Sequence, residues 1–201
     1  MPTPDPRPLD DVLTDLRSFL DTLVAAGFSP PDEMLQSAIE CYEDELAPDA
    51  LRPHAERMLR ESLDAHAAAQ ASWPQTTDCD RLDAALAELE SRGIFARQNY
   101  WCCGTCGCAA IDDEMQQAAA RGAQVRGYTF YHEQDTDSAV EDGSLYLNYG
   151  SADHPAGPQA AVAIGEEVRD TLERHGLSVH WDGTIERRIG VVLDWKRRSL
   201  A

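Results

Sequence analysis

Apolar residues recur every three or four positions through the first part of the chain, which is the spacing of amphipathic α-helices. The pattern predicts four helices: one from residue 9 to Gly27, one after Ser29, one over residues 48–72 and one that begins at Thr77. Ser29-Pro-Pro-Asp32 is expected to place a capping serine before a proline at the first helical position. Thr77 and Asp80 have the spacing of a capping box.

The periodicity changes after Gly93, where short strand patterns alternate with helical ones. Strands are predicted at residues 94–101, 126–132, 145–149, 177–181 and 189–195, and helices at 107–120, 138–141 and from the loop 150–158 to His175. The last two strands flank Asp182-Gly183, a dipeptide suited to a hairpin. This order predicts an α+β (or α/β) fold with a mixed sheet of about five strands covered by helices.

Three regions are expected along the chain. Residues 1–8 form a proline-rich leader without a fixed fold, residues 9–78 a helical region, and residues 79–201 an α/β domain that carries a cysteine cluster.

Charge and hydropathy exclude two classes of partner. The formal net charge is −19, from 36 acidic against 17 basic residues, and no basic stripe offsets it. Such a chain repels a phosphate backbone, so nucleic-acid binding is not expected. No apolar run reaches the roughly 18–20 residues that span a bilayer, and a cytoplasmic protein is expected. The acidity suits steering toward a protein partner with a basic surface, although solubility alone would also explain it.

Four of the six cysteines lie within seven positions, at Cys102, Cys103, Cys106 and Cys108. In a reducing compartment such a cluster indicates a metal site, redox chemistry or buried thiols before it indicates disulfides. For a tetrahedral zinc site we expect ligands from Cys103, Cys106, Cys108 and His132. Because no second C-x-x-C follows, the closing ligand stays open among Cys102, Cys79, His132 and His154.

Two other interpretations of the cysteines stand beside the metal site. Cys103-x-x-Cys106 lies between a predicted strand and helix, and a helix N-terminus there would lower the pKa of a thiol and suit redox catalysis. Trp101 adds to the likeness to thiol–disulfide oxidoreductases, whereas the extra Cys102 and the lack of a convincing cis-proline depart from it. Alternatively, the cysteines are small buried side chains between strand and helix.

His132-Glu133-Gln134-Asp135 follows the second predicted strand just as the cysteines follow the first. If the two strands are parallel, their carboxyl ends share one edge of the sheet, where α/β proteins bind ligands. Cys102, Glu133 and Asp135 would then line the rim of a site containing Cys103, Cys106 and His132. The simpler alternative is that Asp135 or Thr136 caps a short helix and His132 lies on the surface.

Familiar catalytic motifs are missing from the sequence. It contains no G-x-G-x-x-G, Walker A, H-E-x-x-H or G-x-S-x-G pattern, and the acidic residues near Asp135 lack the spacing of an EF-hand loop. No catalytic residue is therefore assigned, and whether the chain is an enzyme stays open.

Several segments resemble a bacterial family that is defined only as a domain of unknown function, number 6891. The similarity is carried by Gly93-Ile94 and by residues 102–107 (CCGTCG), 127–136 (GYTFYHEQDT), 145–150 (LYLNYG) and 181–183 (WDG), the last followed by Arg188-Ile189. It extends from the helix near Leu9 to the last residues. The resemblance implies that the cysteine segment and the His132–Thr136 segment belong to one recurrent unit, and it implies no activity.

The function expected from the sequence is an acidic binding or interaction module with a small-ligand or metal site near Cys103, Cys106, His132 and Asp135. The alternatives are a structural zinc site and a thiol redox enzyme that uses Cys103 and Cys106.

Overall fold

The computed structural model describes residues 7–153 and 157–198, so the predicted leader lies almost wholly outside the described residues. The chain divides into two compact units. The first comprises Met1–Pro74 with Lys196–Ala201, and the second comprises Gln75–Trp195. Lys196–Arg198 thus belong to the helical unit, whereas the sequence pattern assigns them to the sheet domain.

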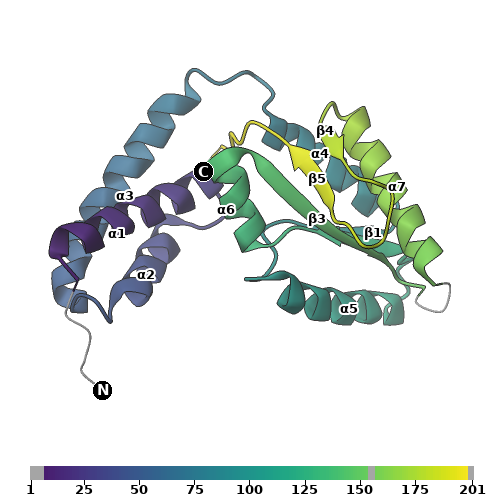
Figure 1. The fold of residues 1–201 in the computed structure, drawn as a ribbon, viewed down its shortest axis with the longest axis horizontal. Helices are drawn as coiled ribbons and strands as arrows, with labels where there is room; N and C mark the ends of the chain where they lie inside the picture. The colour runs from purple at the N-terminus through teal and green to yellow at the C-terminus, as the bar shows by residue number, and fades with distance from the viewer. Residues whose placement is uncertain (1–6, 154–156, 199–201) are drawn as a thin grey trace. The chain divides into compact units, whose positions relative to one another are not determined.

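The first unit contains three helices, α1 (Leu9–Ala26), α2 (Pro31–Tyr42) and α3 (Pro48–Gln70), which pack against one another (Figure 1). Their apolar stripes meet in a core that includes Leu16, Leu20, Ala38, Leu51 and Ala55. Gly27 ends α1 in the left-handed conformation, as predicted. Pro30 rather than Ser29 occupies the N-cap of α2, because Pro31 takes the first helical position.

Residues Lys196–Arg198 complete this unit from the other end of the chain. The Arg197 guanidinium lies 4.4 Å from the centre of the Phe28 ring, its side chain packs on Gly27, and its carbonyl oxygen lies 3.1 Å from Nε2 of His66. Arg198 donates a hydrogen bond of 2.8 Å to the carbonyl of Pro74.

The second unit is built on a five-stranded mixed sheet in the order β1-β2-β3-β5-β4. The strands are β1 (Ile94–Arg97), β2 (Gly127–Phe130), β3 (Ser144–Ser151), β4 (Ser178–His180) and β5 (Ile189–Val192). β1 and β2 are parallel, in a register that pairs Ile94 with Gly127, and the other neighbours are antiparallel. The α+β fold with a mixed five-stranded sheet is confirmed.

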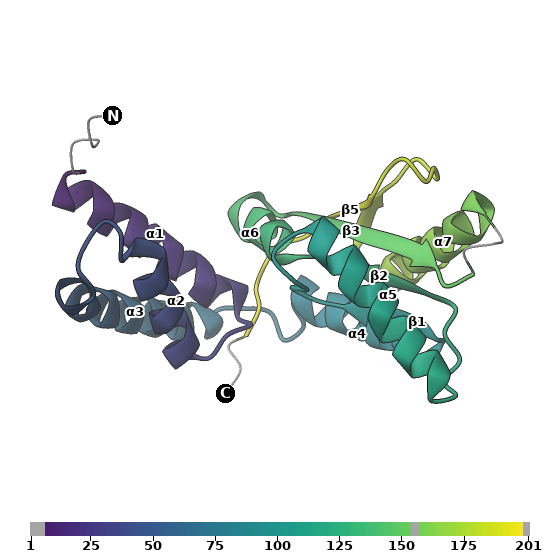
Figure 2. The same cartoon turned by 90° about the horizontal axis from the view of Figure 1, so that it is seen from below.

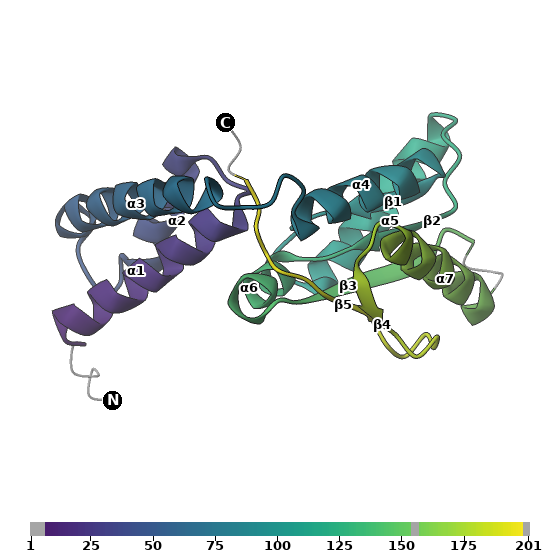
Figure 3. The ribbon, with the colours of Figure 1, turned by 90° about the horizontal axis from the view of Figure 1, so that it is seen from above.

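Helices cover both faces of this sheet. α5 (Gly104–Ala120) lies on one face, and α4 (Asp78–Ser91) and α7 (Pro158–Arg174) lie on the other (Figures 2 and 3). α6 (Glu133–Asp142) connects β2 to β3 and packs on β3. Thr77 and Asp80 form the expected capping box at the start of α4. Ile94, Leu145, Leu147 and Leu172 are fully buried in the core.

Several predicted boundaries in this unit were wrong: β1 and β5 end earlier than predicted, and three other differences arise at the ends of helices and in the last connection. α5 begins at Gly104 rather than at residue 107, so Cys103 is its N-cap. α6 begins at Glu133 rather than at residue 138, because His132 and Asp135 cap it reciprocally. The connection between β4 and β5 is longer than a tight hairpin, and Asp182 instead accepts hydrogen bonds from Thr184 within that loop. None of the described helices is long and apolar enough to cross a membrane.

Candidate functional site

The carboxyl ends of β1 and β2 bring the two predicted segments together. Because the strands are parallel, the start of α5 and the start of α6 lie at the same edge of the sheet. A methyl group on Gly104, the first residue of α5, would lie 3.7 Å from Cδ2 of His132 and 3.9 Å from Oδ1 of Asn148. The turn that carries the cysteines therefore adjoins the turn that carries the histidine.

The loop between β1 and α5 is held in an unusual shape by its neighbour. Asn99 and Trp101 adopt left-handed backbone angles, with φ of 47° and 62°. The carbonyl of Trp101 accepts a hydrogen bond of 3.0 Å from the N–H of Glu133, and Oδ1 of Asn99 accepts one of 2.7 Å from the hydroxyl of Thr136. These contacts tie the loop to the first turn of α6 and end β1 earlier than its sequence predicts.

Three thiols converge at the end of this loop. The sulfur atoms of Cys102, Cys103 and Cys106 all lie within 4.8 Å of one another, and Cys102 and Cys106 are exposed to solvent. Cys103 occupies the N-cap of α5, and Cys106 follows in the first turn. The cluster therefore combines three soft ligand atoms with the positive end of a helix dipole.

The thiols of the cluster differ in acidity. The backbone N–H of Cys106, followed by its thiol, stabilises the Cys103 thiolate and lowers the pKa of Cys103. Hydrogen bonding to Cys103 raises the pKa of Cys106 to about 11, with a further contribution from Cys102. The Cys103 thiol is thus more readily deprotonated than the Cys106 thiol.

The other cysteines lie apart from this cluster. Cys108 is half-buried against the sheet, where its thiol contacts the hydroxyl of Tyr128 and burial raises its pKa. The same environment raises the pKa of Tyr128. Cys79 is buried in α4 and Cys41 is exposed in α2. The structure therefore groups Cys102, rather than Cys108, with Cys103 and Cys106; His154 lies outside the described residues.

His132 is buried and caps α6. Its Nδ1 accepts a hydrogen bond of 3.3 Å from the N–H of Asp135, whose Oδ2 accepts one of 3.2 Å from the N–H of His132. Because Nδ1 is an acceptor, the neutral ring carries its proton on Nε2, which lies 3.1 Å from Oδ2 of Asp135. Both ring nitrogens are therefore engaged within this turn, and burial lowers the pKa of His132. The predicted surface position of His132 is wrong, and Asp135 takes part in the cap as the N3 partner of His132 rather than as the N-cap residue itself.

Arg188 joins the site from the residue that precedes β5. Its Nη1 donates hydrogen bonds of 2.9 and 3.1 Å to the two carboxylate oxygens of Asp135, a side chain that is only 4 % exposed. Its guanidinium lies 5.2 Å from the centre of the Tyr146 ring. Glu133, the third predicted rim residue, is exposed at the start of α6.

Sequence reasoning did not assign Arg188 or Asn148 to the site. The Nδ2 atom of Asn148, on β3, is fully buried and has no hydrogen-bond partner in the described part of the chain. Leu147 pairs with Ile189, so the antiparallel register places Asn148 beside Arg188. The polar residues inside the segments LYLNYG and RI were the available signal, but only the strand pairing brings them together.

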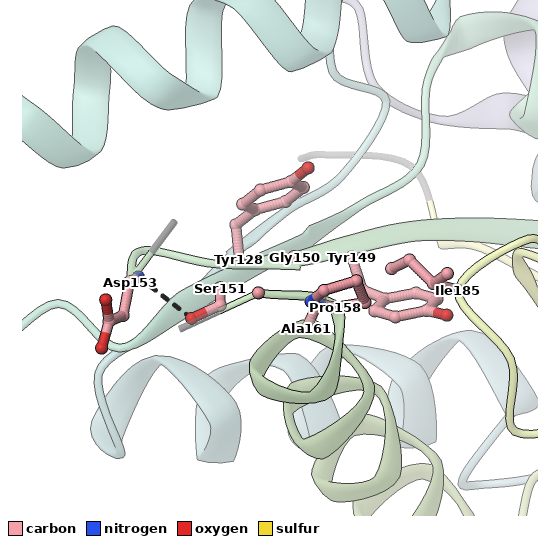
Figure 4. Close-up of a pocket in the computed structure, with 9 residues that line it drawn as sticks. Tyr128, Tyr149, Gly150, Ser151, Asp153, Pro158, Ala161 and Ile185 are labelled. Carbon is pink, nitrogen blue, oxygen red and sulfur yellow. Dashed lines mark hydrogen bonds between the residues drawn. The ribbon is translucent and has the colours of Figure 1, made fainter. Parts of the chain in front are cut away.

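A separate pocket of about 340 Å³ lies near the other end of β2 (Figure 4). Tyr128 lies on one side of Gly150, and Tyr149, Pro158 and Ile185 line the other. The hydroxyl of Tyr149 already donates to the carbonyls of Thr184 and Arg187. The predicted site residues do not line this pocket, whose lining combines two tyrosines with small, apolar and polar residues.

A family model described as a domain of unknown function (DUF6891) matches residues 10–199 of the chain, across both units. No curated protein and no solved structure matches it.

Proposed function

Because the chain belongs to the DUF6891 family, which has no known function, its role has to be inferred from its own site, and we propose that it binds a zinc ion through Cys102, Cys103 and Cys106. The observation that carries the proposal is the convergence of three sulfur atoms within 4.8 Å. Sulfur ligands of a tetrahedral zinc ion lie about 2.3 Å from the metal and hence about 3.8 Å apart. Small side-chain rotations would bring the three sulfurs to that spacing.

The number of ligands argues for a site with an open position. Three thiolates leave one tetrahedral position, and structural zinc sites normally fill it with a fourth protein ligand. His132 lies nearby, but both of its ring nitrogens hold the start of α6. We therefore assign the fourth position to water or to an exogenous ligand, which is the arrangement of zinc sites that bind or activate small molecules.

The electrostatic environment at the start of α5 favours the thiolate form that a bound metal cation requires. A bound divalent ion deprotonates the thiols that it contacts, and the N-terminus of α5 helps to stabilise the resulting negative charge. Sulfur ligands also suit Cu(I) and iron, so the identity of the metal is a matter for measurement.

Elemental analysis of protein purified without chelator tests the proposal. We expect about one zinc ion per chain and, for Cys102→Ser and Cys106→Ser, a loss of zinc affinity of about 100-fold or more, because even outer-shell partners are worth 10–100-fold. Cys108→Ser and Cys41→Ser are matched controls that retain the metal. Metal-free protein with six free thiols, or equal loss of metal in Cys108→Ser, would contradict the assignment.

A second candidate function is thiol–disulfide exchange, which the N-cap position of Cys103 and the location of Cys106 one turn later favour. The Cys103 thiolate would attack a substrate disulfide and release one substrate thiol, and Cys106 would then displace the second as the Cys103–Cys106 disulfide forms. Two electrons pass from the protein dithiol to the substrate disulfide. With oxidised glutathione as substrate, Cys102→Ser retains this reaction, whereas it loses zinc.

The acidic composition supports a binding role compatible with either chemistry. A net charge of −19 would steer the chain toward a protein with a basic surface and away from nucleic acids. We propose such a cationic protein as the partner.

A further inference from the structure

The polar residues beside the thiol cluster are arranged to bind a ligand of their own. We propose that Arg188 and Asn148, on the face of the sheet that α5 covers, form a binding site for an oxyanion, the carboxylate or phosphate group of a small molecule. This site does not depend on a metal at the three cysteines.

Arg188 is fixed in place with donors to spare. Asp135 holds Nη1 through both carboxylate oxygens, and the Tyr146 ring lies under the guanidinium. In the residues that the structure describes, no hydrogen bond reaches its Nη2 or Nε atoms, and 41 % of the side chain is exposed. An arginine held in this way presents a rigid fork of N–H groups that fits a carboxylate or a phosphate.

Asn148 supplies a buried donor beside this fork. Its Nδ2 atom is removed from solvent and unpartnered within the described chain. A buried donor without an acceptor is destabilising, and such groups are rare in folded proteins unless a ligand or water completes them. The register next to the Leu147–Ile189 pair places Asn148 adjacent to Arg188, on the face that also carries Tyr146.

The start of α5 closes the site from above the sheet. Gly104 approaches both His132 and Asn148, and Nε2 of His132 lies 3.5 Å from Nη1 of Arg188. Even a methyl group at Gly104 would contact His132 and Asn148, so glycine lets the first turn of α5 lie close to these groups, and the first turn of a helix favours an anion. The facing charges are those of Asp135 and Arg188, which balance, and of Glu133, which is exposed. Recognition would therefore rest on directed donors rather than on net positive charge.

The test is a titration of the full chain with inorganic phosphate and, separately, with acetate, followed by NMR at the side-chain amide of Asn148 and the backbone N–H of Gly104. We expect saturable shifts at both positions below an ionic strength of about 0.1 M, where screening is moderate. The anion that binds with the higher affinity identifies the chemical group that the site recognises. The Cys102→Ser variant, impaired at the metal cluster, should bind with unchanged affinity, which separates this site from the zinc site.

Two variants and one control decide whether the shifts report this site. Arg188→Gln and Asn148→Leu should each weaken binding about 10-fold or more, because each removes a donor to a charged group. Arg188→Gln also removes the guanidinium that pairs with the Asp135 carboxylate, which should lower stability as well as binding. Asn148→Leu removes an unsatisfied donor instead and should fold at least as stably as the parent chain. Arg187→Gln is the charge-matched control and should bind within twofold. No saturable shift, or equal binding by Asn148→Leu, would overturn the proposal.

Discussion

Substitution of alanine at two glycines of α5 should change stability in opposite directions. At Gly107 the new methyl group would lie 2.5 and 2.8 Å from Cε2 and Cζ of Phe130. Phe130 is fully buried and cannot easily move, because it stacks on Tyr128 at 5.9 Å and meets the edge of Tyr100 at 5.7 Å. Overpacking of this kind costs about 1–3 kcal/mol. Alanine also improves helix propensity by about 1 kcal/mol, so we expect net destabilisation of about 1–2 kcal/mol, with the clash near its upper range.

At Gly104 the same methyl group would meet only ordinary van der Waals contacts of 3.7–3.9 Å. Its backbone is not in the left-handed region, so alanine should stabilise the fold by about 0.5–1 kcal/mol through the unfolded chain. The two variants should therefore differ by about 2 kcal/mol in the free energy of unfolding. Gly104→Ala should nevertheless weaken oxyanion binding, since it narrows the space beside His132 and Asn148.

The assay is urea denaturation of the full chain, followed by NMR at amides of β2 and β3 so that the sheet unit is observed separately from the helical unit. If Gly107→Ala and Gly104→Ala shift the urea midpoint of the sheet unit in the same direction, the close packing of α5 on Phe130 is refuted. Gly122→Ala serves as a control for backbone strain alone, because Gly122 has a φ of 87° and open space around it.

Three further predictions concern the polar turn and the surface. Burial lowers the pKa of His132 from its ordinary 6.5, so the unfolded chain binds the proton more readily, and the free energy of unfolding should fall as the pH drops below about 6.5. His132→Asn keeps a capping acceptor and should flatten this dependence in urea titrations between about pH 7.5 and pH 5. Arg188→Met should destabilise the sheet unit by about 1–3 kcal/mol, because it takes the guanidinium away from the buried Asp135 carboxylate and leaves that charge with its hydrogen bonds to His132. Adding Asp135→Asn should recover part of the loss in the same urea titrations. Affinity purification from the native host should yield a stoichiometric basic protein that high salt releases, and repeated recovery of the bare chain would count against a cationic partner.

The sequence predicted that the cysteine segment and the His132 segment would adjoin, but it did not predict which side chains contact one another there. Two apolar strands joined by a helix predicted a parallel pair, which would bring Cys103 and His132 to one edge of the sheet. β1 and β2 are indeed parallel. Strand pattern and crossover handedness are properties of long segments, so they are legible without coordinates.

The membership of the three-thiol cluster was harder to predict because it depends on where α5 begins. Two glycines among the first residues of the helix, Gly104 and Gly107, weaken its propensity and hide its start. Once α5 begins at Gly104, Cys106 and Cys108 project about 200° apart around the helix, and Cys108 turns toward Tyr128. Cys102 joins the cluster through the left-handed turn at Trp101, a conformation that few sequences reveal.

The capping role of His132 and the position of Asn148 beside Arg188 could not be predicted for a different reason. Serine, threonine, aspartate and asparagine are the usual N-caps, so a histidine there gives no signal. Asn148 and Arg188 are distant in sequence and become neighbours only through the register of β3 with β5.

Because Lys196–Arg198 pack in the helical unit, this unit cannot complete its folding until the end of synthesis. The ribosome makes α1, α2 and α3 first, then the whole of Gln75–Trp195, and only afterwards the residues that pack on Gly27 and Phe28. At translation speeds of about 5–20 residues per second, the three helices wait on the order of ten seconds for their last partners. A chain that ends before Lys196 would contain every strand of the sheet unit and lack the residues that pack on Gly27 and Phe28 in the helical unit.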